Sequence, residues 1–339
     1  MKTLLRQTKA YQFLSARKGR LKHAYLLLFP DAKNLRFALK TFAPLFFDES
    51  VFPVSYSQAE FSAAKARVDA LIETEAFADC LFLPEEGKKF SVENAEAVVE
   101  ECSLRPVECS RKLFVIGDFS DATKEAQNKL LKVLEEPPES VCFLLGATSQ
   151  FSVLPTVLSR VEKAEIPPFT NEEIRRYLLR NAAGITKENA ALCAKSCGGI
   201  PGKAFDLATG GYFQELLQAT KALCFAPPSA LPALVRQYGE TKYKKELLSL
   251  LKIVYFDALT LKTKTNVFSG ARESVSEERH PAGTIEKKDL ISLAASFSFG
   301  GLLKVQQILS EAEKQLYFNG VFPQILEISL CRIQSEKRL

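Results

Sequence analysis

The sequence predicts an α/β fold: a parallel sheet in the first half of the chain, followed by a second half built of helices. Short apolar runs alternate with helical patterns up to residue 166, and helix-type periodicity then continues almost to the end. Alternation of strand and helix favours a parallel sheet that helices cover on both faces. Because such a sheet binds ligands beyond the carboxyl ends of its strands, a site is expected in the loops after Phe29, Ile116 and Leu145.

Length and composition are those of a globular protein with two or three domains. The chain has 339 residues, of which 47% are apolar and 25% charged. No apolar run approaches the roughly 20 residues that span a bilayer, so a membrane role is not expected. The formal net charge of +5 permits a nucleic-acid contact without requiring one.

The cysteine pattern predicts buried, reduced thiols in a cytoplasmic protein. Eight cysteines are scattered through apolar runs without a paired CxxC motif. Cys193 and Cys197 stand one helical turn apart and are the only pair that suggests a common ligand. Because no third or fourth ligand is nearby, no metal site is expected.

The first 22 residues are basic and contain no acid, but they lack the apolar core of a secretory signal. Their apolar side chains are spaced as on one face of a helix, so we predict an amphipathic helix that packs on the body of the protein. A transit peptide is the alternative. The apolar residues are Leu4, Leu5, Tyr11, Phe13 and Leu14.

The strands are predicted where short apolar runs occur, and the helices where the 3.6-residue period holds. A polar stretch from Thr263 to Lys287 has no period and is predicted to be a mobile loop. The predicted strands are Tyr25–Phe29, Cys80–Leu83, Leu113–Ile116, Val141–Leu145 and Ala164–Ile166. The predicted helices begin at Asn171 and Glu188 and then cover Phe213–Cys224, Ala230–Tyr238, Lys244–Lys262, Leu290–Ala295, Leu302–Phe318 and Pro323–Ile333.

A strand, a turn and a helix are predicted between Lys112 and Pro138. The helix is expected to be capped by Asp121 and to end before Pro137, because a residue that precedes proline leaves the helical region. Its predicted buried face consists of Ala126, Leu130, Val133 and Leu134.

The amino-acid sequence of this region is a more specific indicator of family than its hydrophobic periodicity. It reads Asn128-Lys-Leu-Leu-Lys-Val-Leu-Glu-Glu-Pro-Pro138, then Phe143-Leu-Leu-Gly-Ala-Thr148, then Leu154-Pro-Thr-Val-Leu-Ser-Arg160. This run resembles the core of the clamp-loader subunits of bacterial DNA polymerase III, an AAA+ family. The resemblance extends to His23-Ala-Tyr-Leu26, to Gly198-Gly-Ile-Pro-Gly-Lys-Ala204 and, more weakly, to Tyr317-Phe-Asn319.

The phosphate-binding loop of the family's motor subunits is degenerate in this sequence. That loop reads GxxxxGK[ST], in which glycines let backbone amides surround the phosphates, lysine neutralises them and the hydroxyl binds magnesium. No required glycine is present, Leu35 stands where the lysine belongs, and Arg36 replaces the hydroxyl. We therefore expect no bound nucleotide cofactor. The degenerate loop consists of Phe29, Pro30, Asp31, Ala32, Lys33, Asn34, Leu35 and Arg36.

The other nucleotide motifs are also altered. Alignment on Asn128 places Gly117 where the family has its magnesium-binding aspartate, and Asp118 at the following acid. Asp118 is interpreted either as a remnant catalytic acid or, preferably, as a carboxylate that caps the next turn or binds water. Thr148 and Lys203 take the positions of the family's two sensors and are expected to serve packing or to contact solvent. Lys33 and Lys40 are expected to be solvated surface charges. Since the segment 44–78 contains no cysteine, the zinc module of some relatives is not expected.

Ser159 and Arg160 keep the family's Ser-Arg-Cys motif, except that Val161 replaces the cysteine. The resemblance implies that Arg160 is an arginine finger, which reaches the γ-phosphate bound by a neighbouring subunit and stabilises the charge of the transition state. Such a finger needs no phosphate loop in its own subunit. The alternative interpretation is an ordinary surface arginine at the start of a strand.

The resemblance implies three domains: residues 1–166 as an AAA+ core, 167–209 as a helical lid and 210–339 as a helical collar for oligomerisation. It implies a stator like the family's delta-prime member, without ATPase activity of its own, within a polymerase holoenzyme. Its expected partners are the gamma/tau and delta subunits in a ring, the sliding clamp and, through the complex, primer-template DNA. The alternatives are an active motor subunit like gamma/tau, and a separate DNA-binding module that uses the basic N-terminal helix.

Overall fold

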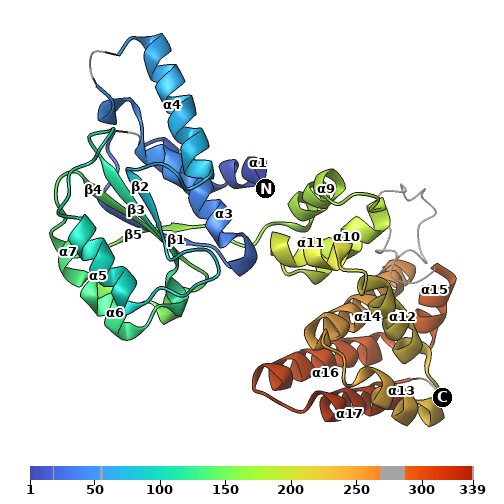
Figure 1. Cartoon of the computed structure of the whole chain (residues 1–339). Helices are drawn as coiled ribbons and strands as arrows, with labels where there is room; N and C mark the ends of the chain where they lie inside the picture. The colour runs from blue at the N-terminus through green and yellow to red at the C-terminus, as the bar shows by residue number, and fades with distance from the viewer. Residues whose placement is uncertain (18, 54–55, 268–286, 338–339) are drawn as a thin grey trace. The chain divides into compact units, whose positions relative to one another are not determined.

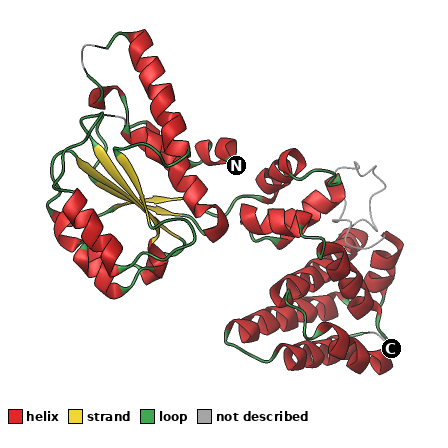
Figure 2. Cartoon of the chain, viewed as in Figure 1, coloured by secondary structure: helices red, strands yellow, loops and turns green. Residues whose placement is uncertain are grey.

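The computed structural model describes residues 1–17, 19–53, 56–267 and 287–337, and the chain forms two compact units (Figure 1). The first unit is Met1–Pro168 and the second is Phe169–Leu339. All five named strands lie in the first unit, and the second is built of helices (Figure 2). The predicted α/β core and helical second half are therefore confirmed. The division of the second half into a lid and a collar stays a prediction.

The sheet is entirely parallel and has the order β2-β3-β4-β1-β5. All five predicted strands are present, although β3 and β4 run two residues further than predicted, and β5 begins two residues earlier. β1 lies between β4 and β5 in the sheet, so the loop that follows β1 begins between these two strands. The strands are β1 Ala24–Leu28, β2 Cys80–Leu83, β3 Lys112–Asp118, β4 Val141–Ala147 and β5 Glu162–Glu165.

Both faces of the sheet are buried, because apolar residues occupy consecutive positions of the central strands. Leu26, Phe114 and Phe143 belong to the core on the face that α5–α7 cover (Figure 1). The rings of Phe114 and Phe143 stack with centroids 5.5 Å apart. Burial of one such ring contributes about 1.5–3 kcal/mol, so this apolar layer holds the sheet and its helices together. The helices of this unit beyond the N-terminus are α3 Ala32–Phe42, α4 Gln58–Glu73, α5 Val92–Glu101, α6 Lys124–Lys129, α7 Leu131–Glu135 and α8 Pro155–Leu158.

The basic N-terminal segment packs on the body of the protein, as predicted, but it forms two helices instead of one. They are α1 Lys2–Arg6 and α2 Lys9–Ser15. Thr8 separates them because its backbone is extended and its side chain accepts a hydrogen bond from the amide of Tyr11. Leu5 and Leu14 are fully buried, and the Tyr11 ring contacts Phe42 of α3 edge-on at 5.2 Å.

The predicted cap at Asp121 is wrong. Asp121 ends a short 3-10 turn, and Thr123 caps α6 by accepting a hydrogen bond from the amide of Ala126 at 3.2 Å. The helix is also interrupted at Leu130, which ends α6 and precedes α7. The predicted buried face is confirmed for three residues, whereas Val133 is half-buried. A shift of two residues at a helix end is typical where several side chains can cap.

The second unit contains nine α-helices within the described residues. α14 continues to Val267 and α15 begins at Lys287, so the prediction of a loop from Thr263 to Lys287 is wrong for its first five residues and its last one; residues 268–286 lie outside the described part of the chain. Lys262 anchors this end of α14 by donating to the carbonyl of Ala294 at 2.8 Å. The helices are α9 Asn171–Asn181, α10 Lys187–Ser196, α11 Pro201–Thr209, α12 Phe213–Phe225, α13 Leu231–Tyr238, α14 Lys244–Val267, α15 Lys287–Ala295, α16 Phe299–Tyr317 and α17 Phe322–Ser335.

The cysteines are free, and most are buried as predicted, but Cys109 is half-buried and Cys331 is exposed. Burial raises the pKa of Cys193 to about 12, so its thiol stays protonated at neutral pH. The described residues contain no cluster of three or more potential metal ligands.

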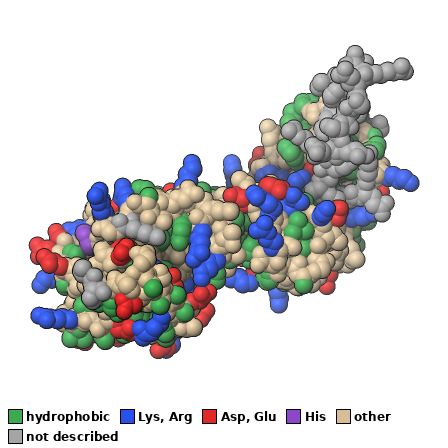
Figure 3. All heavy atoms as spheres, turned by 90° about the horizontal axis from the view of Figure 1, so that it is seen from above, with side chains coloured by type: hydrophobic (Ala, Val, Ile, Leu, Met, Phe, Trp, Pro, Cys, Tyr) green, Lys and Arg blue, Asp and Glu red, His purple; other side chains and the backbone are tan. Residues whose placement is uncertain are grey.

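The surface of the described residues is of mixed charge. The face drawn in Figure 3 carries basic and acidic side chains together with apolar ones. Among the helices of the described segments, none has the length and apolar character that crossing a bilayer requires.

Candidate functional site

The connection between β1 and α3 is too short to surround a phosphate. The amide of Phe29 still bonds to the carbonyl of Ala147 at 2.9 Å, and only Pro30 lies between Phe29 and the cap of α3. That cap is Asp31, which is 2% exposed and accepts hydrogen bonds from the amide and the side chain of Asn34 at 3.3 and 2.8 Å. A helix N-terminus attracts anions, and here the Asp31 carboxylate already occupies it. A phosphate at this place would meet a negative charge.

Leu35 fills the place of the missing lysine with an apolar contact. It is 2% exposed and packs against Gly146 of β4, where an added Cβ would lie 3.2 Å from the Leu35 Cδ1. Leu39, one turn further along α3, would lie 2.8 Å from the same Cβ. The first turn of α3 is therefore seated directly on the sheet, because glycine at 146 lets helix and strand approach closely.

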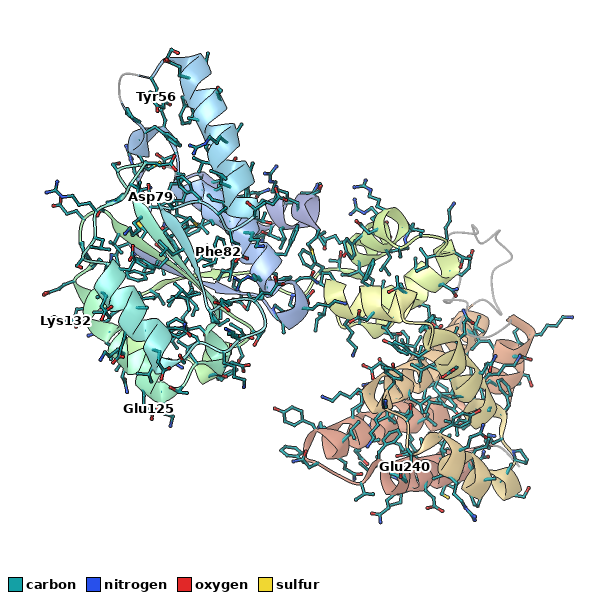
Figure 4. The ribbon with its side chains drawn as sticks, in the orientation of Figure 1. Tyr56, Asp79, Phe82, Glu125, Lys132 and Glu240 are labelled. Carbon is teal, nitrogen blue, oxygen red and sulfur yellow. The ribbon has the colours of Figure 1, made fainter. Side chains whose placement is uncertain are left out.

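Arg36 lies across the carboxyl end of β2. Its Nη1 donates to the carbonyl of Pro84 at 2.9 Å, and its guanidinium carbon is 5.7 Å from the ring centroid of Phe82, which Figure 4 labels on β2. Its Nε and Nη2 donate to the two carboxylate oxygens of Glu75, at 2.6 Å for Nε. This paired arrangement is the strongest geometry an arginine and a carboxylate can adopt. The donors of Arg36 are thus used in hydrogen bonds within the protein.

Glu75 is a structural residue of this region that the sequence pattern did not reveal. It follows α4 in the left-handed backbone region, with φ of 60°, which costs a residue with a side chain about 1 kcal/mol or more. Its carboxylate also pairs with Lys40 at 2.8 Å, so the expectation that Lys40 is a solvated surface charge is wrong. The local sequence pattern does not indicate that Glu75 contacts Arg36 and Lys40, because 39 residues separate Arg36 from Glu75.

Replacing Glu75 by glutamine is expected to lower the free energy of unfolding at neutral pH by about 1–2 kcal/mol, since Arg36 and Lys40 lose their common partner. The hydrogen bond from Arg36 holds the pKa of Glu75 below its ordinary value of 4.5. A carboxylate with a lowered pKa stabilises the fold above the pKa of the unfolded chain, and this contribution disappears as the pH falls through the folded-state pKa. Urea unfolding between pH 7 and pH 3 measures it.

The unfolding curves of Glu75→Gln and the natural chain should converge toward acid. Glu73→Gln is the matched control, because the pair of Glu73 with Lys2 is exposed on both sides and should contribute less than about 1 kcal/mol. A Glu75→Gln deficit that is the same at pH 7 and pH 3 would contradict the assignment to charge.

The second altered motif lies at the end of β3. A Cβ on Gly117 would be 3.9 Å from the Nη1 of Arg36, so Arg36 occupies space beside the position where the family has its magnesium ligand. Asp118 accepts a hydrogen bond from the amide of Ser120 at 3.1 Å and caps the following 3-10 turn. Of its two interpretations, this geometry agrees with the capping role.

The two sensor positions are engaged in contacts within their own units. In the first unit, the amide and the hydroxyl of Thr148 lie 3.0 and 3.2 Å from the Ser120 hydroxyl. In the second unit, Lys203 forms an ion pair with Glu246 at 3.2 Å. Both side chains therefore take part in local structure.

Arg160 follows α8, and its side chain contacts residues of the same chain. Its Nη1 donates to the carbonyl of Thr156 at 2.8 Å and contacts the Ser159 hydroxyl at 3.3 Å, while its Nη2 is 3.0 Å from a carboxylate oxygen of Glu135. The side chain is 28% exposed. It lines a groove of about 470 Å³ whose polar lining includes Lys22, His23, Glu135, Ser159, Arg160 and Glu162.

Gln127 positions the segment that leads to Arg160. It is 1% exposed, donates to the carbonyls of Ala122 and Ser152 at 3.2 and 3.1 Å, and accepts from the amide of Leu154 at 2.8 Å. A buried amide with three such bonds fixes the start of α8 relative to α6. The sequence analysis did not identify Gln127, although it directly precedes the run that begins at Asn128.

Comparison with known proteins gives one family and several relatives. The sequence model described as "DNA polymerase III, delta subunit" matches residues 6–170. The delta' subunit of Bacillus subtilis is 26% identical over 259 residues, which cover 73% of this chain and 74% of that subunit. The tau subunit of Escherichia coli is 30% identical over 123 residues, which cover 36% of this chain. The match spans only 19% of the tau subunit's own length.

Among solved structures, a gamma-subunit-related protein of DNA polymerase III from Thermotoga maritima is similar with a TM-score of 0.40 and 18% identity, covering 96% of this chain and 99% of that one. The sequence matches agree with the resemblance to DNA polymerase III subunits that the motifs indicate. The family model covers both the degenerate phosphate loop and the Arg160 segment. The chain is thus similar in sequence to the delta, delta' and tau subunits of bacterial DNA polymerase III.

Proposed function

We propose that the chain is a clamp-loader subunit of the delta-prime type, which takes part in loading the sliding clamp onto DNA without hydrolysing ATP itself. The proposal rests on one observation: side chains of the protein itself occupy the place where a phosphate would bind. The Asp31 carboxylate caps the helix that would bind phosphate, and Leu35 packs on the sheet where a lysine would reach it. Arg36 is paired with Glu75 at the adjoining strand end. A triphosphate would have to displace all three interactions.

The chain acts through its neighbours in this proposal. Arg160 serves as an arginine finger for the ATP held by an adjacent gamma/tau-type subunit, with Ser159 beside it. The support is chemical: a guanidinium is always charged, matches phosphate geometry with two donors and needs no nucleotide in its own subunit. The proposed partners are gamma/tau and delta subunits in a ring, the sliding clamp, and primer-template DNA through the complex.

The isolated chain should bind no ATP at a saturable site. The measurement is a titration of a fluorescent ATP analogue with the chain in the presence of Mg²⁺, followed by fluorescence anisotropy. It should detect dissociation constants up to about 1 mM. A motor subunit with an intact phosphate loop serves as the positive control in the same buffer. Saturable binding at micromolar concentration, with turnover, would overturn the proposal.

The second candidate function is an active motor subunit. The similarity to tau and gamma/tau subunits, at 27–30% identity over 114 to 123 residues, favours it. Those matches concern the common core of the family, however, and the lost glycines and lysine lie at the positions that bind phosphate. The same titration separates the two candidates, because a motor needs a nucleotide site of its own.

A further inference from the structure

The guanidinium of Arg160 is held from two sides in the described structure. Nη1 is directed to the carbonyl of Thr156 at 2.8 Å, within the turn that ends α8. Nη2 is 3.0 Å from Glu135, at the end of α7. α7 and α8 are therefore joined through this one side chain, and Arg160 does not extend freely into solvent.

The donors of Arg160 are used unevenly. A guanidinium has five N–H donors in a planar fork, and its Nε–Nη2 edge binds a carboxylate or phosphate with two parallel hydrogen bonds. In Arg160 the Nε is buried and has no hydrogen-bond partner among the described residues, and Nη2 forms the ion pair with Glu135 at 3.0 Å. Glu135 thus holds the Nη2 end of this edge, and a phosphate that takes both donors requires the side chain to leave this position, which also exposes Nε.

The charges around Arg160 single out Glu135. The groove contains a second carboxylate, Glu162, but that one pairs with Arg17 at 2.6 Å and with Lys22 at 3.5 Å. The side chain of Glu135 is 58% exposed, so the ion pair is open to solvent and salt. An exposed ion pair of this kind shifts an equilibrium by no more than about fivefold, so a phosphate that binds both donors can displace it.

We propose that Glu135 is a positioning residue for Arg160: its carboxylate retains the Nε–Nη2 edge on the free subunit and yields it to the phosphate of a neighbouring subunit. The inference rests on the proposed arginine finger and adds the residue that controls its release. The charge of Glu135 then sets the concentration at which the chain stimulates its neighbour, and leaves the maximal rate unchanged.

The test uses the full chain assembled with a motor subunit, and measures ATPase rate against the concentration of the chain. Glu135→Gln removes the charge and keeps the shape, and it should lower the half-maximal concentration about two- to fivefold with the same maximal rate. Glu136→Gln is the matched control, because it makes the same charge change one residue away and Glu136 has no ion pair within the described segments. It should move neither quantity.

A double-mutant cycle separates action through Arg160 from a general charge effect. In the Arg160→Ala background, Glu135→Gln should have no effect. The inference is overturned if Glu135→Gln behaves like Glu136→Gln, or if its shift persists without Arg160. If Arg160→Ala itself leaves the neighbour's rate unchanged, the arginine finger fails and this inference with it. If Arg160→Ala lowers the rate but Glu135→Gln shifts nothing, the inference alone fails.

Discussion

Replacing Arg160 by alanine should lower the ATPase rate of a neighbouring motor subunit by a factor on the order of 10³, while the complex still assembles. The transferring phosphoryl group accumulates negative charge in the transition state, and an arginine supplied by the neighbour stabilises that charge. The loss should appear in the maximal rate, because the guanidinium acts on bound ATP. Steady-state ATPase of the assembled complex measures it, and size-exclusion chromatography verifies assembly.

Arg160→Lys is the informative companion variant. Lysine keeps the positive charge but lacks the planar fork, so its rate should fall between those of the natural chain and Arg160→Ala. Arg17→Ala serves as the control for loss of a nearby cation, because Arg17 pairs with Glu162 and has no proposed role at the phosphate. An unchanged rate in the Arg160→Ala complex would remove this residue from the site.

Restoring the lysine of the phosphate loop should damage the protein and should not create a nucleotide site. Leu35→Lys places an ammonium group at a position that is 2% exposed and packed on Gly146. An unpaired buried charge costs about 3 kcal/mol or more, so the variant should unfold at a markedly lower urea concentration. ATP binding should stay absent, because the glycines that expose the backbone amides are still missing.

Leu35→Met is the volume-conserving control and should cost less than about 1.5 kcal/mol. The comparison isolates charge from packing, since both variants replace the same leucine by an unbranched side chain. The explanation of the lost site would be wrong if Leu35→Lys were as stable as the natural chain and bound ATP with micromolar affinity.

Several features of the fold were predictable because they depend on residues close together in the chain. The buried strands follow from short apolar runs such as Val141–Leu145, and the end of α7 follows from Pro137. Helix ends were predicted less well: Thr123 caps α6 in place of Asp121, and α14 continues past Lys262. Competing caps and tertiary contacts decide these ends, and neither is visible in the local pattern.

The sequence by itself determined that the phosphate loop is degenerate, because that conclusion needs only the absence of glycine, lysine and hydroxyl at fixed positions, and it likewise singled out Arg160. Only the tertiary structure decided what replaces the lost site and what holds the arginine. Glu75 reaches Arg36 across 39 residues, and Glu135 reaches Arg160 from another helix. Such pairs form when packing brings distant segments together, and spacing along the chain does not encode which carboxylate meets which guanidinium.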